Sequence, residues 1–88
     1  QKEYDREIRK VQNQIERIEN EIHTLEYELE ALQEVLSNPE NITNEEPFLQ
    51  YSAIQKKLEK LSSTWLELSE EAERLSILKL EDRRQMYK

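Results

Sequence analysis

Ten apolar residues recur in the first 36 positions at alternating intervals of four and three, and this stripe limits the possible folds more than any other feature. The stripe consists of Tyr4, Ile8, Val11, Ile15, Ile18, Ile22, Leu25, Leu29, Leu32 and Leu36. This spacing is the heptad pattern of a coiled coil, because it places every member in one narrow seam along a helix. A helix that is polar elsewhere needs a partner to cover such a seam.

A second stripe with the same spacing provides that partner. It consists of Tyr51, Ile54, Leu58, Leu61, Trp65, Leu68, Ala72 and Leu75. We interpret Trp65 as an anchor of the core, since a lone tryptophan in a seam brings the largest apolar surface. Beyond Leu75 the register would place Lys79 and Asp82 in the seam, so we expect a register shift or fraying there.

Pro39 and Pro47 separate the two stripes. A proline disfavours the helical region for the residue before it and is tolerated only in a helix's first turn. These rules predict a helix over about 3–37, a loop over about 38–46 and a helix over about 47–86. Thr43 or Asn44 is expected to cap the second helix, with capping-box spacing between Thr43 and Glu46.

A short connection between two helices of similar length favours an antiparallel arrangement. The predicted fold is therefore all-α, a single antiparallel two-helix coiled-coil hairpin. Partners across the seam are expected to have residue numbers that sum to roughly ninety. The expected pairs are Leu36 with Ile54, Leu29 with Leu61, Leu25 with Trp65, and Ile18 with Ala72.

Composition excludes several functions for this chain. Without glycine it has no phosphate-binding Gly-rich loop, and without cysteine, and with His23 as its single histidine, it has no zinc ligand set or thiol nucleophile. No apolar run is long enough to span a membrane, so we expect a cytoplasmic protein that binds no membrane. We expect no catalytic or metal-binding residue and no cofactor in the chain. Because it begins at Gln1, we expect it to be a piece of a longer protein.

The 20 acidic and 13 basic residues, which give a net charge of −7, are unevenly distributed. Residues 1–10 sum to +1 and residues 79–88 to +2, so residues 11–78 sum to −10. An antiparallel hairpin brings both basic ends to one base, which predicts a phosphate-binding patch. The candidate contacts are Arg6, Arg9, Lys10, Lys79, Arg83 and Arg84, with a smaller cluster of Lys56, Lys57 and Lys60 on the second helix. Alternatively, these charges complement helix dipoles and keep the coiled coil soluble.

The sequence resembles the C-terminal coiled-coil domain of ABC-F ATPases, in particular the Uup-like branch. The resemblance covers about residues 5–76. It rests on the Glu- and Ile-rich heptads over 15–30, the close of the first arm at 36–39, the Phe48-Leu49-Gln50-Tyr51 opening of the second and the Trp65-Leu66-Glu67-Leu68 element. It implies two ATP-binding cassettes elsewhere in a bacterial parent protein, which use ATP and Mg²⁺ at ribosomes or other nucleic acids. This chain would be a non-catalytic arm that binds DNA or ribosomal RNA and contacts the cassettes.

A competing hypothesis is a purely structural module without nucleic-acid contact. Leu66, Ile77, Leu78 and Leu80 lie off or past the seam, where they offer a surface for another protein or for self-association. The sequence is compatible with a monomeric hairpin or a weak homodimer.

Overall fold

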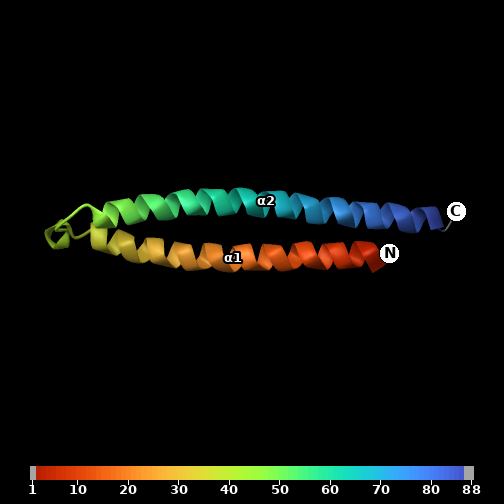
Figure 1. Ribbon diagram of the computed structural model, residues 1–88, viewed down its shortest axis with the longest axis horizontal. Helices are drawn as coiled ribbons and strands as arrows, with labels where there is room; N and C mark the ends of the chain where they lie inside the picture. Colours follow the sequence, from red (N-terminus) through yellow and green to blue (C-terminus); the bar gives the residue numbers. More distant parts are fainter. Residues whose placement is uncertain (1, 87–88) are drawn as a thin grey trace.

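The chain forms two long antiparallel helices joined by a short tip. The structure, a computed structural model, describes residues 2–86 and the side chains of residues 3–85. Helix α1 spans Lys2–Leu36, a short 3-10 helix η1 spans Pro39–Asn41, and α2 spans Glu46–Met86. These bounds differ from the expected ones by at most one residue. The predicted all-α hairpin is confirmed, and it is a rod measuring 72 × 14 × 14 Å (Figure 1).

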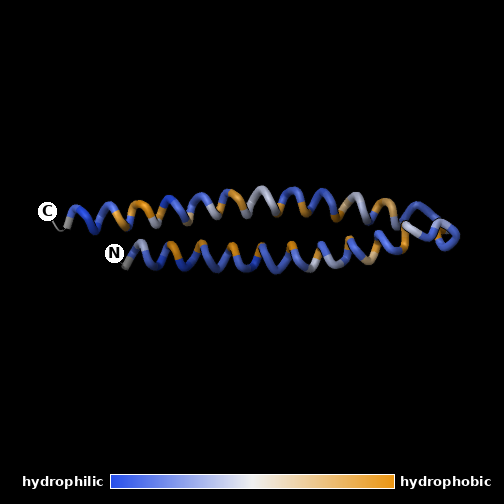
Figure 2. Tube along the Cα trace, turned by 180° about the vertical axis from the view of Figure 1, so that it is seen from behind, coloured by the Kyte–Doolittle hydropathy of each residue, from blue (hydrophilic) through white to orange (hydrophobic). Residues whose placement is uncertain are grey.

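The apolar stripes face each other between the helices, as the hydropathy colouring shows (Figure 2). Every stripe residue of α1 is buried or half-buried, and so is every stripe residue of α2 except Trp65. Val11 and Leu75 are the best-covered residues, with 7% and 8% of their surface exposed. A two-helix rod leaves both sides of the seam open to water, which is why most of its core is only half-buried.

The tip begins where Pro39 stops the first helix. The Ser37 N–H donates to the Gln33 carbonyl at 3.0 Å, and the Ser37 hydroxyl donates to the Glu34 carbonyl at 2.7 Å. No described residue has a positive φ angle, so the reversal needs no glycine.

A side-chain cap then starts α2. Of the two expected caps, Asn44 is the one used, because its Oδ1 accepts the Glu46 N–H at 2.9 Å. Pro47 is the second residue of α2, in the first turn where proline is tolerated. The expected capping box between Thr43 and Glu46 does not form in the described part of the chain.

The register across the seam corrects our expectation by about one heptad. The Gln33 amide donates to the Tyr51 hydroxyl at 3.2 Å, and Lys79 pairs with Asp5, so facing residues have numbers that add to 84 rather than ninety. The physical reason is the position of the turn. A sum of ninety requires a hairpin centred on residue 45, whereas the tip between Leu36 and Glu46 centres it near residue 41, close to the centre of the loop predicted over 38–46.

Two hollows between the helices follow the same register. One is lined by Leu32 together with Ile54, although Ile54 was expected opposite Leu36. The other is lined by Glu19 together with Trp65, whose numbers add to 84, although Trp65 was expected opposite Leu25.

The expected register shift after Leu75 is also wrong. Helix α2 runs without interruption to Met86, past the N-terminal end of α1 (Figure 1). Lys79 and Asp82 take the next seam positions and are half-buried. A lysine is tolerated there because Asp5 neutralises its ammonium group, while the aliphatic part of the side chain covers the seam.

Candidate nucleic-acid interface

The base of the hairpin, where residues 3–10 of α1 meet residues 75–85 of α2, contains six of the nine basic residues predicted to bind phosphate. Five of them are exposed, namely Arg6, Arg9, Lys10, Arg83 and Arg84. The sixth, Lys79, is half-buried and donates to an Asp5 carboxylate oxygen. Lys79 therefore joins the two helices and is not a free cation.

The charges around the Asp5–Lys79 pair shift the pKa of Asp5. The hydrogen bond from Lys79 lowers the pKa of Asp5, and the positive charge of Arg83 adds to the effect. Arg83 thus lies close enough to Asp5 to act on it across the base. Because the pair is largely solvated, it contributes little stability at neutral pH.

A plane through the two helix axes divides the base into two unlike flanks. Helical periodicity places Arg6, Arg9, Arg83 and Arg84 on the side of the Asp5–Lys79 pair or on the outer edge beside it. We call this side the basic flank. It carries five cations, including Lys79, against one carboxylate.

The opposite side is acidic. Glu3 and Glu7 line a hollow there with Tyr4, Leu75 and Asp82. Lys10 projects toward this acidic side by its helical position, so it does not join the four arginines. The single patch predicted from sequence is therefore two surfaces of opposite sign. Sequence counting missed this because it sums charges along the chain and not around each helix.

Lys56, Lys57 and Lys60 are exposed, but the structure does not bring them to the base. In the observed register they face residues 24–28 of α1, about 20 residues and so about 30 Å from the arginines. Lys57 lies on the opposite flank, where it lines a hollow with Glu28. These three lysines form a separate cluster in the half of the rod nearer the tip.

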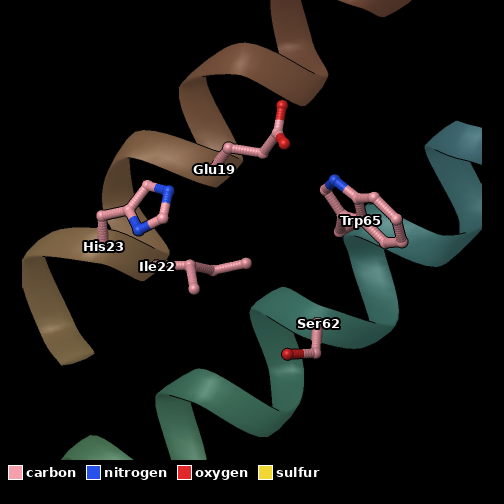
Figure 3. A pocket seen from close by; sticks show the side chains of 5 residues that line it. All are labelled: Glu19, Ile22, His23, Ser62 and Trp65. Atoms are coloured by element: carbon pink, nitrogen blue, oxygen red, sulfur yellow. The ribbon is translucent and has the colours of Figure 1, made fainter.

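Trp65 corrects another expectation, since 37% of its surface is exposed. It lines a hollow with Glu19, Ile22, His23 and Ser62 (Figure 3). Ile22 points toward α2, whereas the indole stands at the side of the seam with its nitrogen toward Glu19 (Figure 3). A two-helix rod has no third element to cover the outer edge of so large a ring. The His23 side chain is 78% exposed, so His23 is a surface residue. Its Nδ1 lies 3.7 Å from Oε1 of Glu26.

The competing hypothesis of a structural module relied on four apolar residues that lie off or past the seam. These residues do not form one continuous surface. Leu66, Ile77 and Leu80 are 49–57% exposed, and Leu78 is half-buried. Leu66 lies eleven residues, about 16 Å, from Ile77 along the helix. The exposed carboxylates of Glu70 and Glu73 interrupt this interval.

The described residues contain no cluster of three or more His, Cys, Asp or Glu side chains placed to hold a metal ion. No described helix combines the length and the apolar character needed to cross a membrane.

In a comparison with known protein families, residues 6–70 match the ABC transporter C-terminal domain. The match covers well over half of the chain, so this protein belongs to that family and is an accessory domain of an ABC protein. Comparisons with curated proteins and with solved structures gave no match. Lys79, Arg83 and Arg84 lie beyond the matched region, so the family assignment carries no information about the α2 side of the base.

Proposed function

We propose that this domain is a nucleic-acid-binding arm and that it contacts phosphates through the basic flank of its base. The observation that carries the proposal is the placement of four exposed arginines around an internally neutralised Asp5–Lys79 pair. Arginine suits this role because its planar group donates two parallel hydrogen bonds to a phosphate. The rest of the rod is strongly acidic, so it repels a polyanion and confines contact to this flank.

The proposal places the domain in an ABC-F ATPase of the Uup-like branch. Membership in the ABC C-terminal family supports it, together with the Trp65-Leu66-Glu67-Leu68 element and the Asn38-Pro39 end of the first arm. In this proposal the parent protein is cytoplasmic and hydrolyses ATP with Mg²⁺ in its cassettes. The arm contributes binding to DNA or ribosomal RNA and takes no part in the chemistry.

The test is a fluorescence anisotropy titration of a labelled duplex DNA and a labelled structured RNA at two salt concentrations. Four free arginines contact at most about four phosphates, so the logarithm of the DNA association constant should fall with the logarithm of salt with a slope no steeper than about −3.6. A difference in affinity between DNA and RNA would identify the nucleic acid that the arm prefers.

A pair of double variants then locates the contact. Arg83→Glu with Arg84→Glu should weaken binding at least tenfold, while helicity stays unchanged because both side chains are exposed. Lys56→Glu with Lys60→Glu makes the same charge change away from the base and should leave most of the affinity. Equal losses in both double variants would show that net charge and not the basic flank determines binding, and would refute the proposal.

A further inference from the structure

An open hollow lies in the tip half of the rod, on the flank opposite the four arginines. It has a volume of about 510 Å³ and is lined mainly by Tyr27, Ala31, Leu32, Ala53, Ile54 and Lys57. Ala31 and Ala53 leave the space open, and Tyr27 stands beside it with 75% of its surface exposed. An exposed aromatic ring next to an unfilled apolar hollow is the pattern of an association surface.

The charges around this hollow are complementary from one helix to the other. Its lining contains one charge from each helix, Glu28 of α1 and Lys57 of α2. Among the described side chains, no ion pair joins Glu28 to Lys57 within the chain. The two helices therefore present opposite charges that are free to pair with another molecule bearing the same arrangement in reverse.

We propose that two copies of this chain associate through this hollow, about a two-fold axis parallel to the rod. Such an axis lays α1 of each copy on α2 of the other at the same level. Tyr27 then packs against Ala53 and Lys57 of the second copy, and Glu28 meets Lys57 of the second copy twice by symmetry.

The charges exclude the other face-to-face arrangement. A two-fold axis perpendicular to the rod lays α1 on α1, which sets Glu28 against Glu28 and the lysines of α2 against each other. Like charges in such positions disfavour association. Toward the base the same flank carries Glu3, Glu7 and Asp82 against a single cation, Lys10, so like charges keep the two rods apart there and the contact is confined to the tip half.

The size of the contact predicts its strength. Half of the rod's 72 × 14 Å face corresponds to about 500 Å² per copy and about 1,000 Å² in total. This area lies at the lower limit for a specific interface, so we expect a reversible dimer that forms only at high concentration. The contact leaves the basic flank free, so dimerisation and nucleic-acid binding are independent.

Sedimentation velocity of the chain from about 5 µM to about 1 mM tests the proposal. The wild-type chain should shift from monomer to dimer, and Ala31→Glu should weaken association about tenfold or more by placing a charge in the hollow. Gln55→Glu is the matched control, since it adds the same charge at an exposed position on the other flank. A wild-type chain that remains monomeric at 1 mM, or equal effects of the two variants, would overturn the proposal.

Two charge reversals give a sharper result. Glu28→Lys alone and Lys57→Glu alone should each abolish dimerisation, because each sets like charges together twice. An equimolar mixture of the two variants should form a heterodimer, because both of its contacts are again between opposite charges. Absence of a heterodimer would refute the pairing of Glu28 with Lys57.

The direction of the axis is tested with a spin label on Gln12→Cys, which is unique because the chain has no cysteine. Gln12 is exposed near the base. Rods that run in the same direction keep the two labels within about 30 Å of each other, whereas a perpendicular axis at the hollow separates them by more than about 50 Å. The longer distance would overturn the proposed symmetry.

Discussion

Truncating Leu75 to alanine tests whether the seam holds this protein together. Leu75 is 8% exposed and is one of the two best-covered residues, so its truncation leaves a space that the neighbouring side chains fill only in part. Removing a buried leucine side chain costs about 2–5 kcal/mol. We expect about 2–3 kcal/mol, because the seam is open on both sides and relaxes more easily than a closed core.

This loss is large relative to the free energy of unfolding of the whole chain. A core of this size supplies no more than about 3–5 kcal/mol, so Leu75→Ala should remove about 40% or more of the free energy of unfolding. For a chain of this length the melting temperature should fall by roughly 10–20 °C. Leu66→Ala is the matched control on the same helix, since Leu66 is 54% exposed and its truncation should change stability by less than about 0.5 kcal/mol.

The assay is urea denaturation followed by far-ultraviolet circular dichroism, with Trp65 fluorescence as a second probe of the same transition. Coincident curves from the two probes would establish that the helices unfold together. If Leu75→Ala and Leu66→Ala cost the same, the seam is not the source of stability and the packing described for α1 on α2 is wrong.

Three further predictions concern the tip and the base. Asn44→Ala removes the side-chain acceptor at the start of α2 and should cost about 1 kcal/mol in urea denaturation, whereas Thr43→Ala should cost almost nothing, and equal losses would contradict the assigned cap. Because Lys79 lowers the pKa of Asp5 from 3.8, the pair stabilises the fold above pH 3.8 and this contribution disappears as the pH falls through the lowered value. The melting temperatures of wild type and Asp5→Asn should therefore differ by a small amount at pH 7 and converge at low pH, and a difference that does not change with pH would contradict the ion pair. Lys79→Leu extends the apolar seam while Asp5 remains solvated, so it should raise the melting temperature, and a lower one would show that the ion pair outweighs seam burial.

The fold was predictable because a heptad stripe needs only local periodicity to be recognised. Pro39 then indicated where the first helix ends, and Pro47 indicated where the second helix begins. Both do so through backbone sterics that act within a few residues. The expected register across the seam was wrong for another reason. The predicted loop and the observed tip between Leu36 and Glu46 have the same length, but the expected pairs were not centred on that loop. A sequence shows where helices stop but not that Pro39–Asn41 form a compact 3-10 turn.

The candidate site shows the same limit at the level of side chains. Summing charge along residues 1–10 and 79–88 correctly placed the cations at one end of the rod, because both termini of a hairpin lie together (Figure 1). It did not show that Lys79 is neutralised by Asp5, which is 74 residues away in the chain. The separation of Arg9 from Lys10 onto different flanks was recoverable from the helical periodicity of the first stripe alone, because the two residues lie on opposite sides of that seam.

Both ends of the hairpin lie at the base, so any polypeptide that continues from either end attaches there and the tip is the free end of a lever. The rod is 72 Å long and contains no glycine hinge. A tilt of about 10° at the attachment would displace the tip by about 12 Å, as in a hinge motion of a rigid body. A small rotation of a structure attached to the base would therefore move the tip by a distance comparable to the thickness of the rod.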